Sequence, residues 1–344
     1  MMRWTLGHLA ILSYIVCGIT VDCVPINGQT VINIPPDPVP VIVNSNTTIN
    51  LLDGGSIPDD FSIGSADGSL TNIELNVFGG AIERSLSTEV GTTVNMSGGL
   101  VELGMTVGGE LNISGGTIEG RITVRDSAIV NFSGGEVDAT TFGGMRLSGG
   151  EVTFTGGAIS GQLLLSENEG GVFNYKGGRI GQDMELWGGS FNVFGGEFLL
   201  DGVPLEDFSD SIQFDIPEEG VLSGVLPDGT SFALNKSFTR HQDLIVDGVL
   251  TLFKAAIPDL GPLVIDVPSS PTPKGLRTGQ VLNLNPGGTI GDIFTINPGS
   301  TLNVNGGDVG FLLEAVNATV NVTMAMSMVR SLRIQVVWWI YLVE

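Results

Sequence analysis

The sequence predicts an all-β protein, a parallel β-solenoid (β-helix) with coils of about 20 residues that a small β subdomain interrupts. Three observations predict it. A short phrase of apolar residue, Asn, apolar residue and Gly-Gly recurs at a nearly constant spacing, as in Leu75-Asn76-Val77 before Gly79-Gly80. Apolar and polar residues alternate around each Asn, and glycine makes up 51 of the 344 residues, roughly twice the usual share.

The repeat is regular enough to define a marker position in each coil. The seven markers are Asn76, Asn95, Asn112, Asn131, Thr153, Asn174 and Asn192, and they lie 19, 17, 19, 22, 21 and 18 residues apart. Six residues after each marker stands an apolar residue: Ile82, Val101, Ile118, Val137, Ile159, Ile180 and Phe198. Seven agreeing units indicate one structural repeat per coil.

Local stereochemistry suggests how each coil is built. An Asn between two apolar neighbours has the period of a β-strand, so the apolar side chains point inward and the Asn points outward. The Gly-Gly pair predicts a sharp corner, because glycine adopts positive φ at low cost. Frequent glycine pairs and β-branched residues disfavour helices, and a propeller blade needs a period near 40 residues.

The same features divide the chain into segments. The start combines Arg3, a short apolar run at residues 9–16 and the small residues Cys17 and Gly18, which is typical of a secretory signal. We predict a signal peptide (1–22), an extended proline-rich lead-in with a first coil (23–70), solenoid repeats (71–200), a β insertion (201–268), a second solenoid segment (269–323) and a non-repeat tail (324–344).

The insertion and the tail depart from the repeat. Residues 226–229 and 247–248 are turn signals between apolar runs, so they predict two hairpins, 221–225 with 231–234 and 244–246 with 249–252. The tail begins where another Gly-Gly is expected after Val322. It is interpreted either as a truncated or frame-shifted coil, which we favour, or as a hydrophobic cap.

Composition excludes several classes of function. The chain carries 14 basic and 37 acidic residues, a formal net charge of −23, which does not suit nucleic-acid binding. Two histidines and two cysteines are too few for zinc fingers or a disulfide scaffold. The apolar runs at residues 9–16 and 334–343 are too short to span a bilayer, so we expect no integral membrane span.

Two outward columns are candidate sites. Seven residues after the marker, four consecutive coils carry Glu83, Glu102, Glu119 and Asp138. Stacked carboxylates repel each other, so a calcium-binding ladder is one hypothesis and a solvated acidic face is the other.

The second column, Asn76, Asn95, Asn112, Asn131, Asn174 and Asn192, predicts a structural amide ladder, with a row of sugar-binding amides as the alternative. We expect no cofactor other than calcium.

The Asn and Gly-Gly units, the signal segment and the acid excess together resemble secreted bacterial Gly-Gly repeat β-solenoids, which include adhesins, autotransporter passengers and planctomycete-type surface repeat proteins. The resemblance covers about residues 44–200 and 275–323. It implies a secreted or cell-surface protein with a structural or adhesive, non-enzymatic role and a glycan or protein as partner. The alternative is a polysaccharide-cleaving lyase or hydrolase. Its carboxylates would act near Arg121, Arg125, Lys176 or Arg179, but no carboxylate pair stands apart from the repeat.

Overall fold

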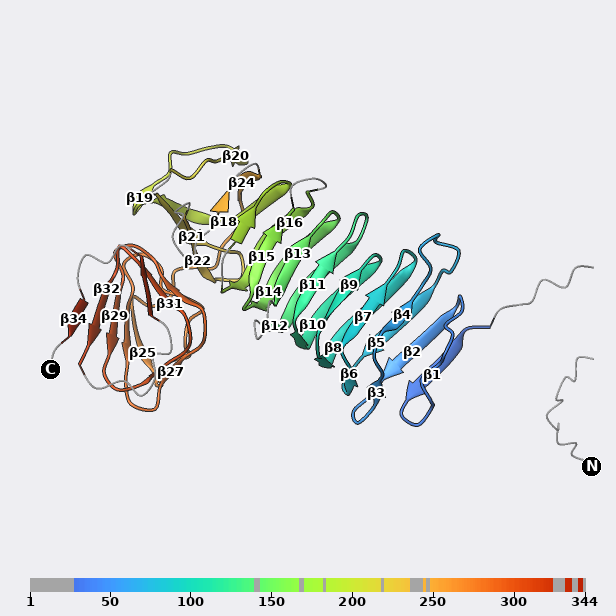
Figure 1. Cartoon of the computed structure of the whole chain (residues 1–344). Coiled ribbons are helices and arrows are strands. Elements are labelled where there is room, and N and C mark those ends of the chain that lie inside the picture. Colours follow the sequence, from blue (N-terminus) through green and yellow to red (C-terminus); the bar gives the residue numbers. More distant parts are fainter. Residues whose placement is uncertain are drawn as a thin grey trace, which may run out of the picture.

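The computed structural model confirms the predicted fold class. It describes residues 28–138, 143–166, 170–181, 184–217, 220–235, 244–245, 248–323, 332–335 and 340–342, and every regular element within them is a strand. Parallel strands stack into a β-solenoid of about 14 turns that lie about 19 residues apart. Figure 1 shows two consecutive stacks of coils, joined by an irregular region.

The long sheet of the first stack contains the marker positions. Its parallel strands are β1 (Thr30–Ile34), β2 (Thr47–Leu51), β5 (Ile73–Val77), β8 (Thr92–Val101), β10 (Glu110–Glu119), β12 (Ile129–Asp138), β14 (Glu151–Ile159), β16 (Val172–Ile180), β18 (Ser190–Leu200) and β24 (Val249–Lys254). Consecutive markers are directly opposite each other, for example Asn95 opposite Asn112 and Asn112 opposite Asn131. This register places equivalent residues in columns along the axis, although the coils differ in length.

A second parallel sheet closes the coils on the other side. Its strands are β4 (Phe61–Ile63), β7 (Ser85–Thr88), β9 (Gly104–Val107), β11 (Arg121–Val124), β13 (Gly144–Leu147), β15 (Gln162–Leu165), β17 (Met184–Leu186) and β23 (Leu244–Ile245). The short β3 (Ser56–Ile57) and β6 (Ala81–Ile82) extend the long sheet in the first coils. Each coil thus buries the apolar half of its alternating pattern between the two sheets.

The core follows the sequence pattern. Both apolar neighbours of every marker from Asn76 to Asn192 are at most 3% exposed. The predicted inward residues six positions later are buried too, except Ile180, which is partly buried against the same core. Towards the end of the stack the core becomes aromatic, because Phe132, Phe154 and Tyr175 are opposite one another in consecutive coils, with neighbouring ring centroids 5.0 and 5.9 Å apart.

The Gly-Gly pairs do not all make corners. The prediction holds at Gly79-Gly80, where β5 ends and β6 begins, but the strands from β8 to β16 run through the pair with a bulge or similar irregularity. A Cβ on Gly98 would lie 2.3 Å from the Phe78 carbonyl oxygen in the preceding coil, and Gly99 has φ +77°. Glycine is required here because the coils approach backbone to backbone and one residue needs positive φ.

The first stack is longer at both ends than the repeat phrase suggests. At its start, the proline-rich lead-in already forms β1, which places Asn33 opposite Asn50. At its far end, the predicted hairpin of 244–246 with 249–252 is wrong. β23 continues the second sheet beside β17, and β24 continues the long sheet beside β18. Residues 201–268 therefore contain one more coil, which returns after an excursion.

That excursion is a small antiparallel unit. The other predicted hairpin is confirmed as β21 (Val221–Val225) paired with β22 (Ser231–Asn235), and β21 also pairs with the end of β18. The short β19 (Val203–Pro204) and β20 (Ser211–Gln213) pair with β18 and β24. These strands cover the far end of the first stack (Figure 1).

The second stack repeats the architecture with fewer coils. Its strands are β25 (Val264–Val267), β26 (Val281–Leu284), β27 (Thr289–Ile290), β28 (Phe294–Ile296), β29 (Thr301–Val304), β30 (Asp308–Val309), β31 (Leu313–Val316), β32 (Thr319–Val322), β33 (Leu332–Gln335) and β34 (Ile340–Leu342). The tail strands β33 and β34 pair in parallel with β31 and β32 and so lie on the last coil, and the choice between a truncated coil and a cap stays a prediction. The predicted signal segment lies outside the described residues.

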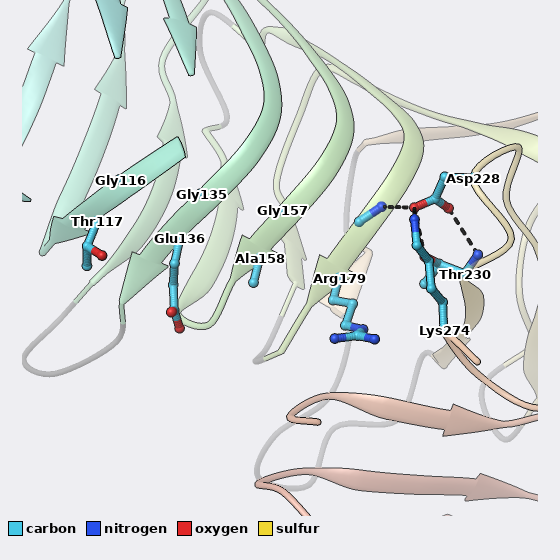
Figure 2. A pocket seen from close by; sticks show the side chains of 11 residues that line it. Gly116, Thr117, Gly135, Glu136, Gly157, Ala158, Arg179, Asp228, Thr230 and Lys274 are labelled. Atoms are coloured by element: carbon cyan, nitrogen blue, oxygen red, sulfur yellow. Dashed lines mark hydrogen bonds and ion pairs between the residues drawn. The ribbon is translucent and has the colours of Figure 1, made fainter. Parts of the chain in front are cut away.

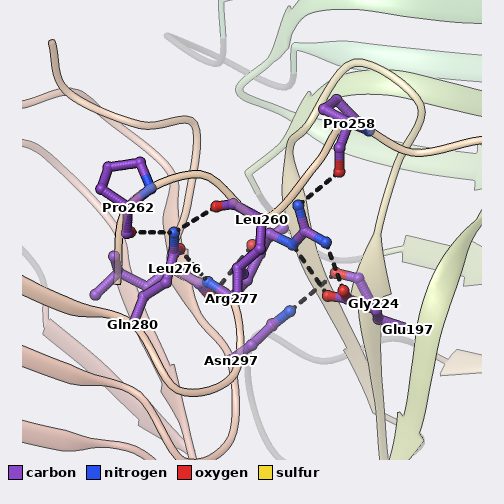
Figure 3. A network of polar contacts seen from close by, with 10 residues as sticks. Glu197, Gly224, Pro258, Leu260, Pro262, Leu276, Arg277, Gln280 and Asn297 are labelled. Carbon is purple, nitrogen blue, oxygen red and sulfur yellow. Dashed lines mark hydrogen bonds and ion pairs between the residues drawn. The ribbon is translucent and has the colours of Figure 1, made fainter. Parts of the chain in front are cut away.

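A polar network joins the two stacks (Figure 3). Arg277, which is 7% exposed, donates through Nε and Nη2 to both carboxylate oxygens of Glu197, at 3.0 and 2.5 Å, and through Nη1 to the Pro258 carbonyl at 2.7 Å. Asn297 Nδ2 donates to the Gly224 carbonyl at 3.0 Å. The Glu197 and Gly224 contacts hold the second stack against the end of the first, and the Pro258 contact holds the connection between the two stacks.

Within the described segments no helix is long and apolar enough to cross a membrane.

Candidate functional site

The outward asparagines form a continuous amide ladder through the first coils. Each Nδ2 donates to the Oδ1 of the preceding marker, from Asn50 to Asn33 at 2.8 Å up to Asn131 to Asn112 at 2.9 Å. In the coils between these two bonds, Asn76, Asn95 and Asn112 each donate to the preceding Asn at 2.9–3.0 Å. The second stack has its own ladder, in which Asn283, Asn303 and Asn321 each donate at 2.8 Å, the first of them to Asp266.

Thr153 interrupts the first ladder. It lies opposite both Asn131 and Asn174, but its side chain is too short to replace an amide. Asn174, which is 8% exposed, donates instead to Glu151 Oε1 at 2.7 Å, and Asn192 continues the row from Asn174 at 2.9 Å. The predicted column is therefore two hydrogen-bonded rows separated by one coil.

We expect Thr153→Asn to join the two rows and stabilise the first stack. One added amide would bond to Asn131 and Asn174, and a net hydrogen bond contributes about 0.5–1.5 kcal/mol. Thermal and urea denaturation measure the change. Thr153→Val is the matched control, because it keeps the shape and offers no amide. An unchanged or lower free energy of unfolding for Thr153→Asn would contradict the expectation.

A groove of about 300 Å³ lies over this ladder. The amides of Asn95, Asn112 and Asn131 line it together with the exposed hydroxyls of Ser97, Ser114 and Ser133. Phe78, which is 55% exposed, closes one end. Repetition in the coils thus creates a row of similar polar groups with an aromatic ring beside it.

The groove mainly offers hydrogen-bond acceptors. Both Nδ2 hydrogens of Asn95 and Asn112 are used, one in the ladder and one on Glu74 or Glu110, at 2.9 and 3.1 Å. Each amide oxygen accepts at most one bond and keeps a free lone pair. Ser114 and Ser133 donate to main-chain carbonyls at 3.4 and 3.2 Å, which leaves their oxygens able to accept. Ligands that donate through hydroxyl groups suit this arrangement.

The acidic column lies elsewhere on the coils. Glu119 is opposite Asp138, and the neighbouring pairs Ile118–Val101 and Val101–Ile82 align Glu119, Glu102 and Glu83 in turn. Glu83 accepts a hydrogen bond from Ser56 at 2.6 Å. Across the described ranges no group of three His, Cys, Asp or Glu side chains could hold a metal ion. Calcium binding by this column stays a prediction.

The basic residues considered for an enzyme are dispersed. Arg125 pairs with Glu89 at 2.9 Å, and Lys176 lies 4.6 Å from the centre of the Phe194 ring. Arg179 lines a separate recess of about 470 Å³ beside the Gly-Gly bulges, shown in Figure 2 with Glu136, Asp228 and Lys274. The structure therefore does not bring Arg121, Arg125, Lys176 and Arg179 into one centre with the acidic column.

Sequence reasoning missed the groove and the recess. Phe78 and the serines two residues after the markers are visible as a pattern in the sequence, but nothing there shows that they border a cavity with the amides. The recess needs Asp228 and Lys274, which lie outside the repeat. Comparison with protein-family models, with curated proteins and with solved structures finds no match. The site must therefore be interpreted from its own chemistry.

Proposed function

We propose that this protein is an exported, non-enzymatic surface component that binds an extended, neutral polysaccharide along the groove over the amide ladder. The observation that carries the proposal is the combination of acceptor groups in a row with one exposed aromatic ring. Sugar hydroxyls donate hydrogen bonds, and the apolar face of a sugar ring packs on an aromatic side chain. Few precisely placed polar groups beside an apolar surface are typical of ligand sites.

The spacing of the groove supports a polymeric ligand. Equivalent Asn and Ser groups repeat once per coil, at the strand separation of about 4.8 Å, which is comparable to the length of one sugar unit in an extended chain. The carboxylates of Glu74 and Glu110 hydrogen-bond to the amides beside the groove. They disfavour an acidic polymer there, because like charges repel.

The test measures binding of soluble neutral oligosaccharides, such as cellohexaose, xylohexaose and mannohexaose, by isothermal titration calorimetry. We expect Phe78→Ala to weaken binding roughly tenfold, equivalent to about 1.4 kcal/mol. Phe311→Ala is the matched control, since Phe311 is 39% exposed and lies in the second stack. Binding that Phe78→Ala leaves unchanged, or no binding to any of the three, would refute the groove as the site.

The same experiment separates the binding role from the enzymatic alternative. Incubation with each oligosaccharide and with an acidic polysaccharide is followed by assays for new reducing ends and for unsaturated sugars. A binding protein releases neither. Product that disappears in a Glu102→Gln/Glu119→Gln double variant would favour the polysaccharide-cleaving enzyme instead.

A further inference from the structure

The recess of about 470 Å³ between the two stacks is chemically different from the groove. Its floor is the column of residues that follow the Gly-Gly pairs: Thr117 opposite Glu136, Glu136 opposite Ala158, and Ala158 opposite Arg179. Asp228 and Lys274 close it from the irregular region (Figure 2). A volume of this size suits a small molecule.

One wall of the recess is a neutral, fixed ion pair. Asp228 accepts hydrogen bonds from the Gly178 amide at 3.1 Å, from the Thr230 amide at 3.0 Å and from the Thr230 hydroxyl at 2.9 Å. Lys274 pairs with the same carboxylate at 2.9 Å, and the Asp228 side chain is only 16% exposed. Because its oxygens are already satisfied, Asp228 is not free to pair with another cation.

Arg179 lines the recess beside this ion pair. It is half-buried, and it makes no hydrogen bond or ion pair with any residue that the structure describes. The acid of the same column, Glu136, lies two coils away, about 10 Å at the usual strand spacing, and Glu136 accepts a bond from Ser160 at 2.9 Å. Ala158 between them is small and leaves space above the floor. Among the described residues, this guanidinium lines a cavity and pairs with no carboxylate.

We propose that this recess binds a hydroxylated organic acid of the size of a uronic acid, with its carboxylate on Arg179. The planar guanidinium matches a carboxylate through two parallel hydrogen bonds, and Lys274 keeps further donors beside it. At the other end of the recess, Thr117 and Glu136 offer partners for hydroxyl groups. The site is independent of the groove, since the two share no lining residue.

The test titrates the full protein with sodium glucuronate, glucose and acetate, using calorimetry. We expect glucuronate to bind at least roughly tenfold more tightly than glucose or acetate, a difference of about 1.4 kcal/mol. Arg179→Gln should lose this preference. Arg121→Gln should keep it, because Arg121 likewise has no partner in the described part of the chain but does not line the recess. Ala158→Leu, which fills the floor without changing charge, should abolish binding.

Several outcomes would overturn the proposal. Glucose binding as tightly as glucuronate would refute a carboxylate site, and acetate binding equally well would refute the saccharide assignment. An unchanged affinity of Arg179→Gln for glucuronate would show that the ligand binds elsewhere. No binding at millimolar glucuronate would refute the site. Failure of the groove is distinguishable, because Phe78→Ala should leave glucuronate binding unchanged and Arg179→Gln should leave neutral oligosaccharide binding unchanged.

Discussion

Replacing Phe154 with alanine should lower the free energy of unfolding by about 3–5 kcal/mol. The Phe154 side chain is fully buried, and its ring contacts those of Phe132, Phe173 and Tyr175, with centroids 5.0, 6.0 and 5.9 Å apart. The substitution removes apolar burial and leaves a cavity. It also removes three ring contacts from the middle of the aromatic column.

Urea denaturation and hydrogen exchange measure this effect together. Each coil contacts mainly its neighbours, so we expect protection to fall first in β12, β14 and β16. Phe154→Leu should restore much of the loss, because leucine refills part of the volume. Phe311→Ala provides the exposed control, with an expected change within about 0.5 kcal/mol. A loss below about 1 kcal/mol for Phe154→Ala would show that this core repacks around the missing ring.

The second large effect is expected at the junction, where Glu197→Ala should cost about 3 kcal/mol. The change leaves the Arg277 guanidinium, 7% exposed, without its carboxylate, and removing one partner of a buried pair costs about 3–5 kcal/mol. The lower end of this energy range applies because the Glu197 side chain is 41% exposed, so water weakens its attraction to Arg277. The second stack should then detach more readily from the first.

The reciprocal substitution should be much milder. Arg277→Met removes the buried charge itself, so Glu197 returns to water and only the Pro258 carbonyl loses a partner, at about 1 kcal/mol. The Glu197→Ala/Arg277→Met double variant should therefore be more stable than Glu197→Ala alone. Limited proteolysis of the connection at residues 255–262 and urea denaturation report this order. Equal losses in both single variants would contradict it.

The sequence was sufficient for the coils because their pattern is local. The apolar neighbours of each Asn, and the inward residue six positions later, depend on strand alternation and on one period. The predicted core residues are accordingly buried, with Ile180 partly so. The repeat phrase does not reveal the β1 coil and the β24 coil, because Pro36-Asp37 and Lys254-Ala255 stand where a Gly-Gly pair would, and Thr251 replaces the Asn of β24.

The contacts between stacks could not be predicted in this way. Glu197 and Arg277 are 80 residues apart, and neither differs in the sequence from an ordinary surface charge. The same holds for the recess, where Asp228 in a hairpin turn bonds to the Gly178 amide 50 residues earlier. Such pairs depend on how the irregular region folds back, and no period describes that path.

The excursion between β18 and β24 has a consequence for the order of folding. Most coils add to the stack by closing a loop of about 19 residues, whereas Ser190 and Val249, which are opposite each other, lie 59 positions apart in the sequence. Closing the longer loop costs about 1 kcal/mol more in chain entropy. The coils from β1 to β18 can therefore form one after another, because each closes only a short loop. The returning β24 strand docks after them, once the β21–β22 hairpin has shortened the path between its ends.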